Sequence, residues 1–174
     1  MEQRKESCPV QLARKSINYY LINKKKLIPP DDLPRELIEN RVGVFVSLHK
    51  GDRLRGCIGT PLATKRNAAE EIIENAISAA IHDPRFSPVT LDEVSQLSIS
   101  VDLLSIPEKV KDTSQLNPKK YGVIVSSGFK RGLLLPDLEG VDTVEEQVDI
   151  AKRKAGIFSE ETVEIERFEV ERYF

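Results

Sequence analysis

The chain has few of the residues that build metal centres and disulfide frameworks. Its 174 residues include two cysteines, two histidines and no tryptophan. Structural zinc sites need about four cysteine or histidine ligands at close, regular spacing, and these residues show no such spacing. Cys8 and Cys57 lie far apart and are expected to be free thiols in a reducing compartment. No metal site is expected.

Long apolar runs are also missing. No stretch approaches the roughly 20 apolar residues that a membrane-spanning helix needs, and the N-terminus has no apolar signal core. We therefore expect a cytoplasmic protein with no membrane partner. The sequence also contains neither a phosphate-binding P-loop nor a dinucleotide fingerprint, because its glycine-rich segment has the pattern of a hairpin. No cofactor is expected.

Charge of one sign is not in excess. The net charge is −2 and the pI is about 5.8, so no global field attracts nucleic acid. Aromatic residues make up 6% of the chain, which leaves no stacking platform for single strands. Nucleic-acid binding is therefore a minor alternative. The hydrophobic share of 40% and the charged share of 31% are those of an ordinary globular protein.

Three segments have the apolar spacing of amphipathic helices. They are residues 7–26, residues 67–83, and a segment that follows the capping box of Thr143 and Glu146. Asn67 with Glu70 forms a second capping pattern, and the prolines of "DPRFSP" end that helix. A shorter helical turn is expected around "RELIEN".

Strand patterns fall between the helices. Residues 42–60 predict a hairpin that turns at Lys50–Asp52, and residues 121–137 predict another. The segment "LSISVDLLS" alternates as a half-buried strand does. The final residues, 161–174, predict one strand whose apolar phase slips, which indicates a bulge near Glu166 and Arg167.

The two halves of the chain repeat one plan of hairpin, helix and strand. "GVFVS" matches "GVIVS", and "RGCIG" matches "RGLLL", which aligns Cys57 with Leu133. Chance similarity between two hairpins is the alternative. The sequence thus predicts an α+β fold in which a duplicated β-hairpin, helix and strand unit forms a mainly antiparallel sheet flanked by helices. We expect one domain, 1–174, with lobes 1–106 and 107–174.

The hexapeptide "LRGCIG", residues 54–59, is the candidate site. Strand alternation places Arg55 and Cys57 on one face. A hairpin turn of even length would add three residues of the preceding strand to that face: Val44, Val46 and Leu48. His49 would then lie opposite and be a poor base for the thiol. Gly56 and Gly59 would let a backbone or a flat ligand approach closely.

A second group follows the helix of residues 67–83. His82 is the better candidate base, and Asp83 and Arg85 would line the rim of a cleft beside Cys57. Each residue also has a structural interpretation. Cys57 could be a small packed hydrophobe, His82 a cation at a helix C-terminus, and Asp83 a turn former. Arg55 could bridge internal groups or contact a ligand.

These residues resemble the AMMECR domain family, named for an Alport syndrome chromosomal region. The resemblance rests on "FVSLHKGDRLRGCIGT", "DPRFSP", "LSISVDLLS", "GLLLPDLEG" and "KAGI" and covers almost the whole chain. "LRGCIG" is the family's hallmark. The aromatic-rich stretch usual after "LLP" is absent, and Ala151 stands where many relatives have cysteine.

The resemblance implies an intracellular α+β domain with a duplicated sheet-and-helix unit. Prokaryotic relatives are similar to protein A of the AmmeMemoRadiSam system, which is associated with a Memo-like protein and a radical SAM enzyme. From the residues we expect a ligand-binding or partner-binding domain, whose partner is a protein or a small molecule. The alternatives are an enzyme that uses Cys57 as catalytic nucleophile or redox thiol, and a factor that modifies or binds nucleic acid.

Overall fold

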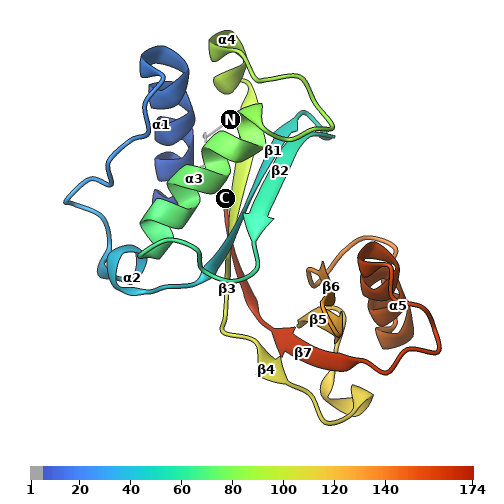
Figure 1. Cartoon of the computed structure of the whole chain (residues 1–174). Helices are drawn as coiled ribbons and strands as arrows, with labels where there is room; N and C mark the ends of the chain where they lie inside the picture. The colour runs from blue at the N-terminus through green and yellow to red at the C-terminus, as the bar shows by residue number, and fades with distance from the viewer. Residues whose placement is uncertain (1–5) are drawn as a thin grey trace. The chain divides into compact units, whose positions relative to one another are not determined.

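The protein forms two compact units, each with its own four-stranded sheet. The structure is a computed structural model that describes residues 6–174. The first unit holds residues 6–103 and Glu171–Phe174, and the second holds Leu104–Val170. The chain therefore passes from one unit to the other twice (Figure 1). None of the described helices is long and apolar enough to cross a membrane.

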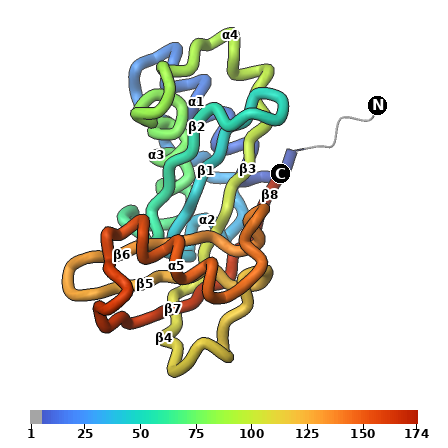
Figure 2. Tube along the Cα trace, turned by 90° about the vertical axis from the view of Figure 1, so that its right-hand side faces the viewer, coloured from blue at the N-terminus to red at the C-terminus, as the bar shows by residue number. Residues whose placement is uncertain are grey.

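The first sheet has the strand order β2-β1-β3-β8, and helices cover one of its faces. Its elements, in chain order, are α1 (Cys8–Asn23), α2 (Arg35–Glu39), β1 (Gly43–Lys50), β2 (Arg53–Thr60), α3 (Ala68–Ile81), α4 (Leu91–Val94), β3 (Leu97–Leu104) and β8 (Val170–Tyr173). Figure 2 shows β2, β1 and β3 running side by side. The predicted helices, hairpin and β3 strand of this half are confirmed, with helix ends a few residues inside the expected limits.

Helix α3 packs against the first sheet. Asn67 caps it by accepting a hydrogen bond from the Glu70 N–H at 2.9 Å. Its apolar face packs with β1 and α1 in one buried core. The buried Glu71 carboxylate accepts bonds from Thr60 Oγ1 at 2.6 Å and from the Thr64 N–H at 2.7 Å. A fully bonded buried acid fixes the helix start against the end of β2.

The first hairpin contains a β-bulge, and the bulge changes which residues share a face. The pairing is Lys50 with Arg53 at the turn, but it shifts by one residue between Leu48 and His49. Arg55 is the extra residue, and beyond it Cys57 pairs with Ser47. The expectation that Val44, Val46 and Leu48 share the face of Cys57 is therefore wrong. Those three are fully buried in the core beneath α3.

The second sheet has the order β4-β7-β5-β6. Its unit contains β4 (Glu108–Lys109), a short 3-10 helix η1 (Thr113–Gln115), β5 (Gly122–Ser127), β6 (Lys130–Leu134), α5 (Val144–Ala155) and β7 (Glu164–Phe168). The Thr143–Glu146 capping box is present, and Gly156 ends α5 in the left-handed conformation with φ 65°. The second predicted hairpin and its helix are thus confirmed.

The two units share one design, as the sequence repeat predicts. Read from the hairpin outward, the strand orders β2-β1-β3 and β6-β5-β7 are equivalent, and each sheet adds one strand on the far side. A Cβ at Gly56 would overlap the Ala79 carbonyl oxygen of α3, and one at Gly132 would overlap that of Ala151 in α5. The aligned glycines thus have the same task of letting a helix backbone lie directly on the hairpin.

The final segment differs from the single bulged strand that the sequence predicts. It forms two strands, β7 and β8, which belong to different sheets and are separated at Glu169. The Glu169 carbonyl accepts a bond from the Ser105 N–H at 2.9 Å, and its N–H donates to Ser105 Oγ at 2.9 Å. The phase slip in the sequence therefore marks a change of sheet and not a bulge within one strand.

Candidate functional site

The Cys57 thiol lies on the sheet face opposite α3. Ser47 Oγ donates a hydrogen bond to Cys57 Sγ at 3.2 Å, and both residues are half-buried. Gly59 follows on the same face, where a Cβ would overlap the Phe45 ring. The first sheet thus presents a thiol, a hydroxyl and an aromatic ring together, and part of this surface is accessible to solvent.

The main chain at Cys57 is held from outside the sheet. β2 is an edge strand, so half of its N–H and C=O groups find no partner in the sheet. The Cys57 N–H donates to Asp83 Oδ2 at 2.9 Å, and Arg85 Nη2 donates to the Cys57 carbonyl at 3.2 Å. The Asp83 and Arg85 side chains therefore satisfy the strand at this residue as a neighbouring strand would.

Asp83 and Arg85 also bind each other. Arg85 donates to Asp83 through Nε at 2.9 Å and through Nη2 at 2.7 Å. These bonds hold the pKa of the Asp83 carboxyl well below its usual range, although burial of the carboxylate acts in the opposite direction. The same hydrogen bonds to Asp83 raise the pKa of Arg85. A fixed guanidinium thus lies at the main chain of Cys57.

Arg55 is engaged by internal acceptors. Its Nε and Nη2 donate to the two Glu93 carboxylate oxygens at 3.2 and 3.1 Å, and its Nη1 donates to the Ser87 carbonyl at 2.8 Å. Only 15% of the side chain is exposed. Arg55 and Cys57 have no side-chain partner in common within the described chain. Of the two interpretations left open by the sequence, this geometry favours the structural bridge.

Glu93 completes the bridge from its place on α4. Besides Arg55, its carboxylate accepts from the Thr90 N–H at 3.1 Å and lies 3.5 Å from Lys50 Nζ. The hydrogen bonds from Arg55 and Thr90 lower the pKa of Glu93 to about 2. The bridge therefore ties the turn end of the hairpin to the segment that follows α3.

The remaining predicted residues lie in different surroundings. His82 is the exposed C-cap of α3, and its ring makes no hydrogen bond with any residue of the described chain. Gly56 is buried against α3, so the backbone that approaches it is the chain's own helix. Asp83 is 4% exposed and lies below the surface and not on a rim. His49 alternates with Ser47 and so shares the Cys57 face.

Ser47 and Glu93 were missed by sequence reasoning. A hairpin without a bulge would place Ser47 opposite Cys57, and nothing in the residue types of "DRLRG" marks the extra residue of the bulge. Glu93 had a usable signal, because Thr90 and Glu93 form a capping box at the start of α4. Such a glutamate is held in place by the helix start and can also receive a cation.

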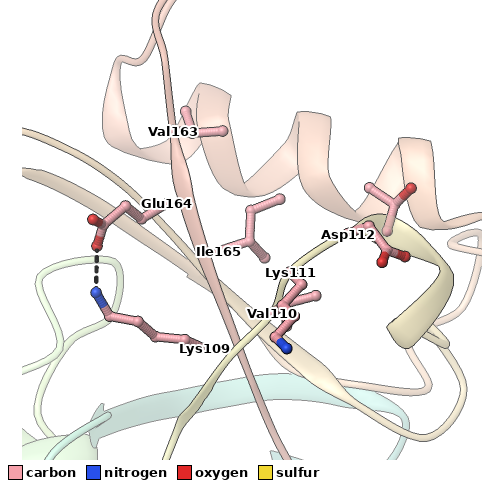
Figure 3. A pocket seen from close by; sticks show the side chains of 8 residues that line it. Lys109, Val110, Lys111, Asp112, Val163, Glu164 and Ile165 are labelled. Atoms are coloured by element: carbon pink, nitrogen blue, oxygen red, sulfur yellow. Dashed lines mark hydrogen bonds and ion pairs between the residues drawn. The ribbon is translucent and has the colours of Figure 1, made fainter.

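The second unit contains a cavity of about 390 Å³ that holds none of the predicted residues. It lies between the chain after β4 and the start of β7, and Figure 3 shows Lys109 facing Glu164 at its edge, at 3.2 Å. Its apolar lining comes from Val110, Val163 and Ile165. Because this charged pair is mutually neutralised and largely exposed, the lining does not favour a ligand of either charge.

Fold and site together define a class of protein: a duplicated α+β chain whose first hairpin carries a cysteine with its main chain bound by an aspartate and an arginine. Residues 10–173 match the AMMECR1 family. The chain belongs to that family.

Relatives span bacteria and archaea. A protein of Thermotoga maritima is 57% identical over 166 residues, which cover 94% of this chain and 95% of that protein. A protein of Clostridium acetobutylicum is 51% identical over 165 residues, and the match covers 94% of this chain but 35% of that longer protein. The crystal structure of an uncharacterized protein from Pyrococcus horikoshii aligns with a TM-score of 0.83 at 35% identity, covering 94% of this chain and 88% of that one.

Proposed function

We propose that the protein is an intracellular binding domain whose site is the Cys57 face of the first hairpin. The observation that supports this most strongly is the division of roles among the hallmark residues. Arg55, Asp83 and Arg85 form their hydrogen bonds with the protein itself, whereas among the described residues the Cys57 thiol and the Ser47 hydroxyl bond only to each other. In this proposal the charged residues position the strand, and the thiol and hydroxyl meet the ligand.

The chemistry of this face suits a ligand that accepts or shares weak hydrogen bonds beside a flat apolar surface. A thiol is a weak donor, a hydroxyl is both donor and acceptor, and Phe45 offers a ring. Arg85 adds a positive charge at the Cys57 carbonyl. His49 would be a further contact on the same face. The family resemblance names a Memo-like protein and a radical SAM enzyme as candidate partners.

Selective blocking of the thiol tests the proposal. The full chain carrying Cys8→Ser is immobilised with Cys57 either free or alkylated, and proteins and metabolites retained from a cell extract are identified by mass spectrometry. We expect a set of species that alkylation of Cys57 removes. Leu133→Ala, the matched change at the equivalent position of the second unit, should leave that set unchanged. If the same species are retained whether Cys57 is free or alkylated, the proposal is contradicted.

A Cys57-dependent enzyme is the second candidate, favoured by the guanidinium of Arg85 at the main chain of Cys57. The two functions require different pKa values of the Cys57 thiol. An enzyme requires an apparent pKa well below the free value of about 8.5, measured from the alkylation rate against pH. A binding domain requires no such shift. Salt-dependent retention on RNA or DNA would instead support the nucleic-acid alternative.

A further inference from the structure

The open edge of the second sheet is strand β6. Ser127 pairs with Lys130 across a two-residue turn, and Val125 pairs with Gly132. In an antiparallel hairpin, alternate residues turn their N–H and C=O groups toward the partner strand, so those of Arg131 and Leu133 point outward. The Lys154 ammonium confirms this direction, because it donates to the Leu133 carbonyl from outside the sheet at 3.0 Å.

The equivalent position in the first unit is closed. There the Cys57 N–H and carbonyl are both occupied, by Asp83 and Arg85. At Leu133 only the carbonyl has a partner, since no side chain of the described residues accepts a bond from its N–H. Arg131 likewise has no acceptor for its main chain from outside the sheet, and its side chain is 41% exposed. The edge of β2 is thus hydrogen-bonded at Cys57, whereas the equivalent edge of β6 has, among the described residues, a free N–H at Leu133.

One cation without an ion pair to any described acid reaches this open edge: Lys154, whose ammonium donates to the Leu133 carbonyl. Lys152, Arg153 and Lys154 form the last turn of α5, and none of the three has an ion pair with a described acid. Gly132 places that turn on β6, because it lies against Ala151 and Ala155. Lys130 and Arg131 are already paired with Glu161 and Glu166. The cation available to a partner at this edge is therefore Lys154.

We propose that β6 is a strand-addition site for an extended acidic segment of a partner protein. The Leu133 N–H would donate to a carbonyl of that segment, and the outward groups of Arg131 would continue the ladder. An acidic side chain of the segment would meet Lys154, which uses one of its three N–H donors on Leu133. A second copy is disfavoured as occupant, because edge-to-edge pairing would bring two sets of α5 cations together.

Nuclear magnetic resonance of the isotope-labelled full chain tests this proposal. The probe is a short capped peptide that alternates valine and glutamate, and the control peptide has lysine in place of glutamate. We expect the acidic peptide to shift the amide signals of Arg131 and Leu133 but not that of Cys57. Leu133→Pro removes the outward N–H without touching the ladder to β5, and Leu133→Val is its matched control.

The charge requirement is tested separately by Lys154→Glu. We expect this variant to bind the acidic peptide about tenfold more weakly and to gain affinity for the lysine peptide. Unchanged Leu133 signals with both peptides would overturn the proposal, as would equal binding of the two. Concentration-dependent shifts at Leu133 without peptide would also overturn it, in favour of a second copy. None of these results bears on the Cys57 site.

Discussion

At the scale of single residues, the contacts around Cys57 distinguish it more than its residue type does. A cysteine can be tolerated in a strand without being demanded, as Leu133 at the equivalent position demonstrates. What sets Cys57 apart is its surroundings: Ser47 on the sulfur, and Asp83 with Arg85 on its main chain. Asp83 and Arg85 lie two residues apart in the short "DPR" turn, so their mutual geometry is fixed locally.

Glu93 gives a prediction with a defined sign. Its folded pKa of about 2 lies below the unfolded value of about 4.3, so the Arg55–Glu93 bridge stabilises the fold above that unfolded value. The stabilisation is lost as the pH falls through about 2. We expect Glu93→Gln to lower the free energy of unfolding at pH 7 by about 1–3 kcal/mol.

Urea unfolding of wild type and Glu93→Gln across pH checks this. The difference between the two proteins should shrink as the pH falls from about 5 toward 2, because Glu93 of the unfolded wild-type chain takes up a proton in this range whereas folded Glu93 does so only near pH 2. Asp92→Asn, at the neighbouring acid of α4, is the control. A difference that stays constant or grows over this range would show that the bridge does not set the Glu93 pKa.

At the scale of elements, each hairpin packs closely against a helix because a glycine stands at the point of contact. Gly56 and Gly132 each lie against a helix carbonyl, Ala79 and Ala151 respectively. We expect Gly56→Ala and Gly132→Ala each to destabilise the protein by about 1–3 kcal/mol, because the helix backbone must move. Thermal unfolding of each variant measures this. Ser98→Ala, at an exposed position of β3, should change little, and an equally small effect at either glycine would contradict the packing described.

The elements also mark where sequence reasoning succeeds. Helices α3 and α5 follow from caps and apolar spacing, since Asn67 and Thr143 act locally. Register does not follow in the same way. A bulge adds one residue, which reverses every later face assignment, and no local pattern marks Arg55 as that residue. The faces of the candidate residues and their contacts therefore required the structure.

At the scale of the whole molecule, the chain shares its strands between two units. The residues after β7 return to the first unit as β8, where Arg172 Nε and Nη2 donate to the Asp102 carboxylate at 2.7 and 2.9 Å. Asp102 is 4% exposed. A buried carboxylate of this kind needs its partner, so the end of the chain is part of the first fold and not an appendage.

Removal of that partner should be costly. We expect Arg172→Ala to destabilise the protein by about 3 kcal/mol, since it leaves the buried Asp102 carboxylate without its main donor. Lys109→Ala removes an ion pair to Glu164 in which both side chains are over 70% exposed, and it should cost less than about 1 kcal/mol. Denaturant unfolding compares the two. Equal effects would mean that β8 does not contribute to the first sheet as described.

The central claim is that the Cys57 thiol lies at an accessible face of the sheet. Asp83 and Arg85, which are hydrogen-bonded to each other, hold the main chain of Cys57 there. Alkylation of Cys57 in the folded full chain carrying Cys8→Ser, followed by mass spectrometry with increasing denaturant, tests it most directly. We predict modification without denaturant, at a rate that low denaturant leaves unchanged. Modification that appears only where the protein unfolds would show that the thiol is packed away, and it would contradict the account.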